Sequence, residues 1–395
     1  MFPIEPTHDQ AIQISEAITK GNTTTEWSIC DDVIHLREWG TERTHILPRP
    51  PINDCLVGTS RDCLLRLEDP YVSRKHAQLK FERGKWSIRD LGSRNGLRQD
   101  NARRDEFTLA PGTEISLGAT TLIAESERLI ELRNFCSRII GWTSDRIGEV
   151  DHALRALRLA VTRRAALVLC GKADLVPVAR ALHRLTLGSD RPFIVCDPRR
   201  RTTSASVRSE ANHGTALLAL TSAAGGSLCV RALRWPIDFS VLLALLRNPG
   251  ARAQLFVCAN GPNDSRDLLS APIHVSPLSE RASELPRIIG EYLHDAIVTL
   301  NVPIVDLSNA DRQWILDHAA TSLPEIEKAA LRVVALRASS EDVTQAADLL
   351  GMVQISLSNW LSRRPPLPPP PVHDAGPALA ESRGHTKSPT QETDK

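Results

Sequence analysis

The chain has 395 residues, of which 42% are hydrophobic and 24% charged, a composition typical of a folded protein with two or three domains. Its 48 basic and 47 acidic side chains leave a formal net charge of +1, which excludes a global electrostatic attraction to nucleic acids or membranes. The segment Met1–Lys20 lacks a long apolar core, and no apolar run approaches the roughly 18 residues of a membrane span. We therefore expect a cytoplasmic protein without a membrane partner. The eight cysteines form no C-x-x-C pair and no zinc-type cluster, which predicts reduced thiols and no metal site.

The first folded region, residues 27–128, shows short strands separated by turns. Leu79–Phe81 and Trp86–Ile88 alternate apolar and polar residues on either side of a Glu82–Lys85 turn, which predicts a β-hairpin. Three further apolar segments follow between glycine and proline turns, at residues 107–109, 115–117 and 121–124. Many short strands at regular spacing indicate an all-β sandwich.

Four sequence boxes in this region resemble the forkhead-associated (FHA) family. They are Val57–Gly58, Val72–Ala77, Asp90–Gly96 and Leu109–Gly118. In the same order, the family has a glycine-arginine pair, an S-R-x-H-A box, a D-L-x-S-x-N-G box and a closing L-x-x-G-D-x-I-x-L-G. The resemblance implies a β-sandwich whose loops bind a phosphothreonine-containing protein.

The same resemblance assigns roles to individual loop residues. It implies that Ser73 and Arg74 contact the phosphate, that Arg94 flanks it, and that Asn95 holds the peptide main chain. These residue types suit the task, because a phosphate brings nearly two negative charges and forms its strongest hydrogen bonds with hydroxyl, amide and guanidinium donors. The resemblance also implies structural roles in the loops for Gly58, His76 and Gly96.

One position departs from the family pattern. Thr59 follows Gly58 where the family usually has arginine, and Arg61 lies two residues later. We expect Arg61 to reach the phosphate from a neighbouring loop. The alternative is a pocket without phosphate affinity in a domain that is only a protein-binding scaffold. The combination of Ser73, Arg74 and Asn95 favours a working pocket.

The middle region, residues 135–300, alternates helical and strand-like segments, which predicts an α/β domain with a parallel sheet. The order and spacing of six short segments resemble the AAA+ domain of bacterial activators of sigma-54 RNA polymerase. These segments are Ala179–His183, Arg191–Val195, Gly225–Leu228, Arg266–Leu268, Pro277–Arg281 and Glu284–Pro286. The alternative is an unrelated α/β domain.

The catalytic parts of an AAA+ ATPase are absent from this region. A phosphate-binding loop needs G-x-x-x-x-G-K-[ST], but Gly171–Lys172 is followed by Ala173 and lacks the first glycine. Arg231 and Ala232 stand where the family has the acidic pair that holds magnesium, and the family's sigma-contacting loop is missing. We therefore expect no enzyme activity and no cofactor.

The C-terminal region, residues 306–364, is helical throughout, and its last part resembles the Fis-type helix-turn-helix that ends the same activators. The resemblance rests on the small Ala347, the turn at Gly351 and apolar residues at 350, 357 and 361. Five polar residues of the second helix are expected to face the DNA major groove, namely Gln354, Ser356, Ser358, Asn359 and Arg363. Between Glu341 and Arg364, three acids and two bases leave a charge of −1, which disfavours DNA binding. A helical dimerisation or capping bundle stays the alternative.

We expect the terminal segments, residues 1–26 and the proline-rich 365–395, to lie outside the folded domains, the latter as a disordered tail. Together these features predict a multidomain chain: an FHA sandwich, an α/β AAA+-like domain and an all-α C-terminus. The predicted function is a phosphothreonine-dependent transcriptional regulator that binds DNA, with a homo-oligomer as a further expected assembly. The alternative is a phosphoprotein adaptor in a serine/threonine kinase pathway that does not bind DNA.

Overall fold

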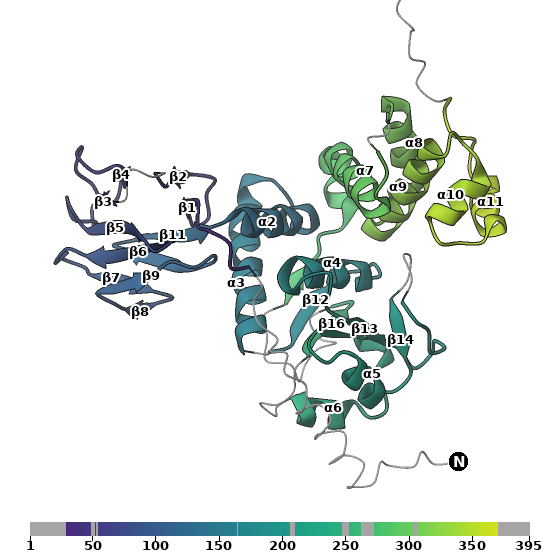
Figure 1. The fold of residues 1–395 in the computed structure, drawn as a ribbon, viewed down its shortest axis with the longest axis horizontal. Helices are drawn as coiled ribbons and strands as arrows, with labels where there is room; N and C mark the ends of the chain where they lie inside the picture. Colours follow the sequence, from purple (N-terminus) through teal and green to yellow (C-terminus); the bar gives the residue numbers. More distant parts are fainter. Residues whose placement is uncertain are drawn as a thin grey trace, which may run out of the picture.

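The computed structural model describes residues 29–48, Ile52, 54–163, 165–205, 210–246, 253–261, 272–303 and 306–369. The expected N-terminal extension, the AAA+-like segment Arg266–Leu268 and the tail from residue 370 onward lie outside these residues. Figure 1 shows a β-sandwich on one side, an α/β region and a helical region on the other, and α2 and α3 between them.

The N-terminal part is the expected all-β sandwich. One sheet has the strand order β2-β1-β11-β10-β7-β8 and the other the order β4-β3-β5-β6-β9. The strand bounds are β1 His35–Glu38, β2 Thr44–Ile46, β3 Asp54–Gly58, β4 Leu65–Arg66, β5 Ala77–Glu82, β6 Lys85–Asp90, β7 Leu97–Gln99, β8 Ala102–Arg103, β9 Glu106–Thr108, β10 Glu114–Leu117 and β11 Thr120–Glu125. The predicted hairpin is confirmed as β5 and β6, with Phe81 opposite Trp86. Arg83 and Gly84 form its turn, and both have the positive φ that a two-residue hairpin loop requires.

Two helices follow the sandwich. Ser126 caps α2 (Glu127–Ile140), and a short 3-10 turn (Ser144–Arg146) leads into α3 (Ile147–Arg163). Both helices place apolar residues at helical spacing, and their buried faces pack against each other. Figure 1 shows both between the sandwich and the rest of the chain.

The middle part contains the predicted parallel sheet, with the strand order β14-β13-β15-β16-β12-β17. Its strands are β12 Leu167–Cys170, β13 Phe193–Cys196, β14 Ala211–His213, β15 Ser227–Arg231, β16 Gln254–Ala259 and β17 Ile273–His274. The α-helices between them are α4 Val176–Leu187, α5 Ala216–Ser222 and α6 Phe239–Leu246. The strands β12, β15 and β16 are buried almost throughout, which is typical of a sheet covered on both faces.

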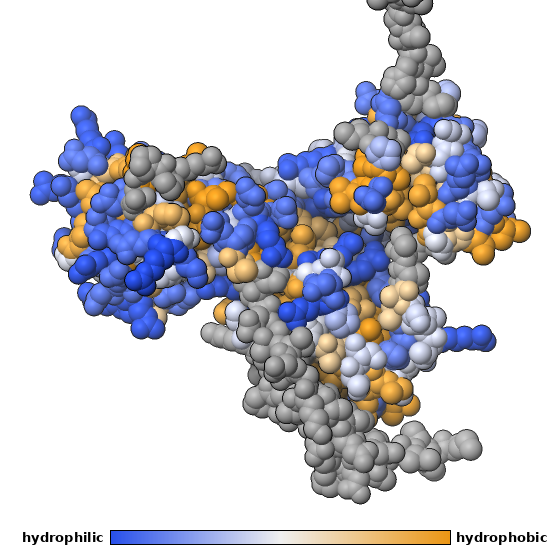
Figure 2. Space-filling view, viewed as in Figure 1, coloured by the Kyte–Doolittle hydropathy of each residue, from blue (hydrophilic) through white to orange (hydrophobic). Residues whose placement is uncertain are grey.

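The C-terminal part is helical, as expected. It contains α7 Leu285–Leu300, α8 Asn309–Ala319, α9 Leu323–Ala338, α10 Val343–Leu349 and α11 Gln354–Ser362. The expected domain boundary at residue 300 would assign α7 to the α/β region, but α7 packs with α8 and α9 (Figure 1). Figure 2 shows hydrophobic residues at the outer end of this part. At the start of α11, Val353 and Ile355 are 66% and 67% exposed. No described helix is long and apolar enough to cross a membrane.

Candidate functional site

The loop between β4 and β5, which carries Ser73 and Arg74, lies directly against Gly58 at the end of β3. A Cβ atom at position 58 would lie 2.3 Å from the carbonyl oxygen of Arg74, so only glycine fits. The neighbouring amides of Thr59 and Ser60 donate to the carbonyl oxygens of Ser73 (3.2 Å) and Arg74 (3.0 Å). Backbone contacts with the end of β3 therefore fix this loop, in which Arg74 is exposed and Ser73 is half-buried.

The buried side chain of His76 connects the β4–β5 loop with the β6–β7 loop. This side chain is fully buried, and its Nδ1 atom accepts a hydrogen bond of 3.1 Å from the amide of Ser73. Since Nδ1 accepts, the proton lies on Nε2, which donates to the carbonyl oxygen of Gly96 at 3.1 Å. In this neutral tautomer, the His76 ring connects the two loops by one hydrogen bond to each.

The second loop, between β6 and β7, is ordered by its own side chains. Asp90 accepts from the amides of Gly92 and Ser93, both at 3.0 Å, and from the Ser93 hydroxyl at 2.6 Å. The Ser93 oxygen in turn accepts from the amide of Gly96 at 3.0 Å. Gly92 and Gly96 have φ values of +73° and +72°, a conformation that glycine adopts without strain. Of the three residues between these glycines, Ser93 is half-buried, whereas Arg94 and Asn95 are exposed to solvent.

Two hydrogen bonds bring the predicted binding residues of both loops together. The amide of Arg94 donates to the hydroxyl oxygen of Ser73 at 3.1 Å, and the side-chain amide of Asn95 donates to the carbonyl oxygen of Tyr71 at 2.7 Å. The Ser73 hydroxyl thus keeps its own proton for an incoming acceptor. The Asn95 side-chain oxygen likewise keeps its lone pairs for a peptide amide.

Arg61 lies on the β3–β4 loop, next to Ser60, whose amide is bonded to the carbonyl of Arg74. The neighbouring loop therefore carries a cation to this end of the sandwich, while Thr59 contributes only a backbone bond. Within the described ranges, Arg61, Arg74 and Arg94 are exposed and form no ion pair with an acidic side chain. Three guanidinium groups without acidic partners are suited to an anionic ligand.

Two residues near this site were not predicted from the sequence. The Arg103 guanidinium lies beside the second loop, since a Cβ atom at Gly96 would be 3.1 Å from its Nε atom. Tyr71 contributes the carbonyl that Asn95 holds. Asp100 and Asn101, both at positive φ, turn the chain back from β7 into β8 and so bring Arg103 here. That Asp-Asn pair is a turn signal that could have indicated the hairpin.

A model of the FHA domain matches residues 55–118, which contain both loops. Residues 55–118 form an FHA domain.

Relatives of this FHA domain occur in other bacterial proteins. The FHA domain-containing protein FhaB of Mycobacterium tuberculosis is 37% identical over 68 residues, which make up 17% of this chain and 44% of FhaB. The glycogen accumulation regulator GarA of Mycolicibacterium smegmatis is 35% identical over 67 residues, 17% of this chain and 42% of GarA. A structure solved in an analysis of phosphothreonine-dependent FHA domain interactions is 31% identical and covers 24% of this chain and 95% of that chain, with a TM-score of 0.22. The chain thus spans less than half the length of FhaB and GarA.

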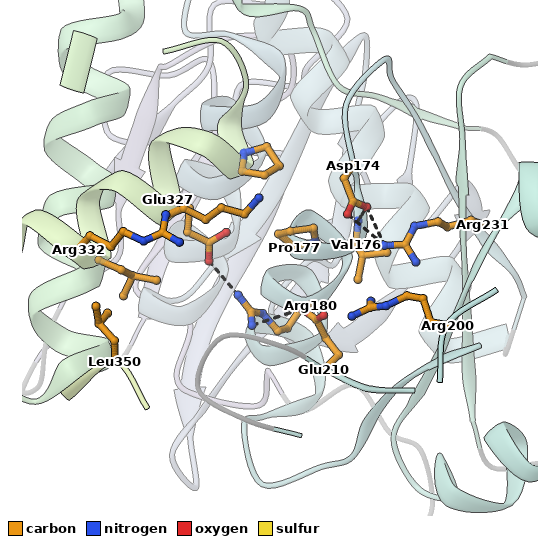
Figure 3. Close-up of a pocket in the computed structure, with 13 residues that line it drawn as sticks. Asp174, Val176, Pro177, Arg180, Arg200, Glu210, Arg231, Glu327, Arg332 and Leu350 are labelled. Carbon is orange, nitrogen blue, oxygen red and sulfur yellow. Dashed lines mark hydrogen bonds and ion pairs between the residues drawn. The ribbon is translucent and has the colours of Figure 1, made fainter. Parts of the chain in front are cut away.

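The α/β region has a cavity of about 270 Å³ beside the ends of its strands (Figure 3), lined by residues of α4 and α9 and by Arg231. Arg231 donates to Asp174 at 3.0 and 3.1 Å and to the buried Asp197 at 3.2 Å, and Arg234 donates to Asp197 at 2.8 Å. Burial opposes ionisation of Asp197, but the hydrogen bond from Arg234 and the other donors hold its pKa below its usual value. A positively charged side chain thus stands at the end of β15, beside the cavity. In the described part of the chain, no group of three or more His, Cys, Asp or Glu side chains could hold a metal ion.

The residues predicted to contact DNA all lie exposed on α11 or just after it. The structure divides them between two faces. Ser356, Asn359 and Arg363 line an open groove together with Arg332 of α9 and Arg364, while Gln354 and Ser358 lie outside it. Arg332 and Arg364 flank the Trp360 ring, with their Cζ atoms 4.6 Å and 4.3 Å from its centroid, respectively. The groove therefore adds a cation from α9 that the sequence of the helix-turn-helix alone does not contain.

Proposed function

We propose that this chain is a regulator that binds a phosphothreonine-containing protein through the loops of its FHA domain. The observation that supports this most directly is the hydrogen-bonded pair of loops that presents Ser73, Arg74 and Arg94 together without acidic partners. A phosphate group needs such a set of hydroxyl, amide and guanidinium donors. The structures related to this domain include one from a study of phosphothreonine-dependent FHA interactions.

Calorimetry with matched phosphothreonine and unphosphorylated peptide libraries tests this proposal. We expect the full chain to prefer phosphorylated peptides, and Ser73→Ala or Arg74→Ala to weaken binding by roughly 1.5–3 kcal/mol each, the usual value of a hydrogen bond to a charged group. Lys85→Ala serves as the control, because Lys85 lies at the opposite end of the β5–β6 hairpin. Equal binding of both libraries by the full chain would refute phosphate recognition and point to Thr59 as the cause.

We further propose that the α/β region is a scaffold without ATPase activity. Two features support this: the sequence at Gly171–Ala173 lacks a complete phosphate-binding loop, and Arg231 is paired with Asp174 and Asp197. A positive side chain at this point opposes binding of Mg²⁺ by electrostatic repulsion. A titration with ATP and magnesium should show no saturable binding, and an affinity in the micromolar range would contradict the proposal.

As a further part of this function, we propose that the C-terminal helices bind DNA. This proposal is supported by the exposure of Asn359 and Gln354, which can pair with adenine, and by the presence of Arg363 and Arg332 in one groove. Gel shifts with the full chain and with a chain that ends before Glu341 provide the test. Arg363→Ala should weaken binding to all sequences and lower the salt slope by about one unit, whereas Asn359→Ala should relax sequence preference.

A phosphoprotein adaptor that does not touch DNA is the second candidate. The exposed apolar side chains of Val353 and Ile355 favour it, because they are typical of a surface that contacts another protein or a second copy of the chain. The charge of −1 between Glu341 and Arg364 is also unfavourable for DNA. Equal DNA affinity of the full and shortened chains in the gel shift would make the adaptor function the better conclusion.

A further inference from the structure

We propose that the Tyr71 ring is a specificity contact that packs against an apolar side chain of the bound phosphopeptide, close to its phosphothreonine. The inference rests on the proposed phosphopeptide function and adds a second chemical requirement to it. The partner would carry an aliphatic or aromatic residue near the phosphothreonine as well as the phosphate itself. Three observations on the described residues support this: the exposure of the ring, the fixation of its backbone and the charge of its surroundings.

Tyr71 is one of the large side chains that the domain leaves open to solvent. It is 63% exposed and lies two residues before Ser73, in the loop that carries the predicted phosphate contacts. Other aromatic residues of the sandwich are packed, as shown by Phe81 and Trp86, whose ring centroids are 5.3 Å apart. An exposed aromatic ring beside a binding site is the usual form of an anchor for a partner's side chain.

The backbone of Tyr71 is held from both sides. Its amide donates at 2.8 Å to the carboxylate of Asp69, which is 6% exposed and also accepts from the amides of Ala119 (2.7 Å) and Thr120 (2.8 Å). Its carbonyl accepts from the Asn95 side chain at 2.7 Å. Asp69 and Tyr71 thus connect the loop that contains them with the β10–β11 turn and the β6–β7 loop.

Gly118 shows how closely this loop packs. A Cβ atom there would lie 2.8 Å from the Tyr71 carbonyl carbon and 2.9 Å from its Cβ atom, closer than such atoms approach in proteins. The ring therefore projects from a backbone that cannot shift toward the turn. Only its two side-chain torsions remain to be fixed on binding, so contact with a peptide costs little conformational entropy.

The charges around Tyr71 indicate which side chains it can accept. The face of an aromatic ring attracts both apolar groups and cations. Arg74 lies three residues after Tyr71, and Arg94 directly precedes Asn95, whose side chain holds the Tyr71 carbonyl. Both arginines are exposed without an ion pair among the described residues. They repel a lysine or arginine of the peptide, which leaves an apolar side chain as the favourable partner.

A phosphothreonine peptide array bound by the full chain tests this inference. Each position that flanks the phosphothreonine is varied between apolar, polar and charged residues. We expect one position to favour apolar residues by roughly two- to tenfold, the range measured for contacts between aromatic rings. Tyr71→Ala should lose this preference and keep the preference for phosphate, and Tyr71→Phe, which retains the ring, should keep both. Ile46→Ala is the control, because Ile46 is 79% exposed on the other sheet.

The outcomes separate this inference from the proposed function. An array without any dependence on phosphate would overturn the phosphopeptide function and the inference with it. A phosphate-dependent array that is the same for the native chain and Tyr71→Ala would overturn the inference alone. Loss of phosphate dependence in Tyr71→Ala, with a melting temperature equal to that of the native chain, would also overturn it, because Tyr71 would then support the phosphate site itself.

Discussion

At Gly58, the absence of a side chain lets β3 approach the Ser73–Arg74 loop of the proposed phosphopeptide site. Because a Cβ atom there would lie 2.3 Å from the Arg74 carbonyl oxygen and 2.8 Å from that of Ser73, Gly58→Ala must displace the loop. We expect a loss of about 1–3 kcal/mol in the free energy of unfolding, as for other overpacked positions, and a marked loss of phosphopeptide affinity. Chemical denaturation and calorimetry on the full chain measure both effects.

The matched control is Gly148→Ala in α3. A Cβ atom at Gly148 meets nothing within 4 Å, and the helix favours alanine over glycine. This variant should retain peptide affinity with unchanged or slightly higher stability. If Gly58→Ala behaved in the same way, the close contact between β3 and the Ser73–Arg74 loop would not exist in solution.

His183 gives the α/β region a defined dependence on pH. Its side chain is 1% exposed, with Nδ1 2.8 Å from the Ser227 hydroxyl and Nε2 3.0 Å from the Arg191 carbonyl oxygen. Burial lowers its pKa from 6.5 to about 4, so the folded state holds the neutral imidazole while the unfolded chain takes up a proton below pH 6.5. Stability should therefore fall as the pH decreases from 6.5 toward 4, by up to roughly 3 kcal/mol.

The measurement is the free energy of unfolding at several pH values for the native chain and for His183→Gln. Buried carboxylates such as Asp197 and Glu125 have pKa values below their usual 3.8 and 4.5. Their contribution to the free energy of unfolding is therefore lost only as the pH falls below about 4.5. Between pH 4.5 and 6.5 the difference between the two proteins isolates the histidine. Parallel curves in that window would show that His183 is not buried in its neutral form.

The candidate residues of the FHA site could be selected from the sequence because short boxes with fixed spacing contain them. Ser73, Arg94 and Asn95 are brought together in the structure, and His76 and Gly58 occupy supporting positions. Tyr71 and Arg103 could not be found in this way. Their positions depend on contacts between segments far apart in the sequence, such as Asp69 with Thr120.

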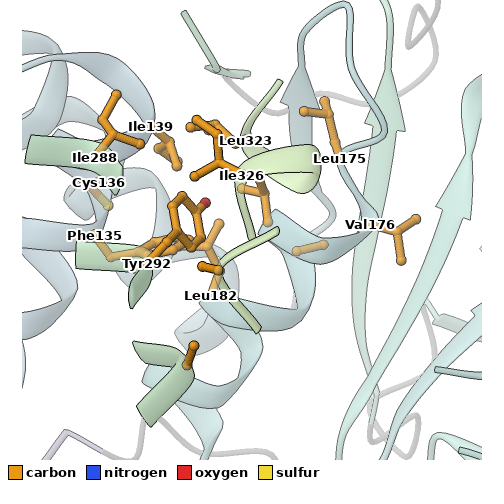
Figure 4. Close-up of a cluster of buried hydrophobic side chains, with 14 of the residues drawn as sticks. Phe135, Cys136, Ile139, Leu175, Val176, Leu182, Ile288, Tyr292, Leu323 and Ile326 are labelled. Carbon is orange, nitrogen blue, oxygen red and sulfur yellow. The ribbon is translucent and has the colours of Figure 1, made fainter. Parts of the chain in front are cut away.

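At the scale of secondary structure, periodicity predicts the strands and helices well but not which helices share a core. Leu175, Leu182 and Val176 of the α/β region belong to the same hydrophobic cluster as Tyr292 of α7 and Ile326 of α9 (Figure 4). The sequence pattern shows that each of these faces is apolar. It does not show which other helix or strand each face packs against, because apolar side chains pack without directional bonds.

The first residues of the proline-rich segment are bound to the helical region. The Trp314 indole donates to the carbonyl oxygen of Pro365 at 3.2 Å, and Arg337 donates to that of Pro368 at 2.6 Å. Trp314→Phe keeps an aromatic ring but removes the donor, so we expect a loss of about 0.5–1.5 kcal/mol in the free energy of unfolding. Denaturation followed by tryptophan fluorescence measures it.

A chain that ends at Arg364 provides the control for this contact. In that background Trp314→Phe should have a much smaller effect, because the acceptor at Pro365 is already gone. An equal effect in both backgrounds would show that Trp314 acts through its packing with Trp360, whose ring centroid is 5.7 Å away, and not through the proline segment.

At the scale of the whole molecule, the FHA domain is fixed to α3 by ion pairs that connect distant parts of the chain. Arg155 pairs with Glu114 of β10, and its Cζ atom lies 4.0 Å from the centroid of the Trp39 ring. Arg158 pairs with Asp100, in the turn that follows β7. The sequence predicts each region separately, but no motif marks these pairs, since charged side chains are common on helix surfaces. The domains are consequently less independent than their sequence boundaries suggest.

The centre of this interface is the buried Arg37 of β1, which pairs with Glu125 and with Asp151 of α3. Asp151 also accepts from the amide of Gly40 at 2.7 Å, and burial alone would lower the pKa of Arg37, but these two carboxylates raise it. Asp151→Ala leaves the buried guanidinium with one carboxylate partner, Glu125, besides the backbone carbonyls of Glu38 and Thr41. Removal of one partner from a buried ion pair typically costs 3–5 kcal/mol, and because Glu125 remains we expect about 3 kcal/mol here.

Hydrogen exchange on the full chain measures this loss of stability at the contact between the FHA domain and α3. Asp151→Ala should accelerate exchange of the amides of β1 and β11, which flank the ion pair, while the sheet of the α/β region keeps the exchange rates of the native protein. Asp151→Asn retains an acceptor for Gly40 and should have a smaller effect. Uniform acceleration throughout the chain, or none in β1 and β11, would contradict the conclusion that Arg37 and Asp151 hold the FHA domain on α3.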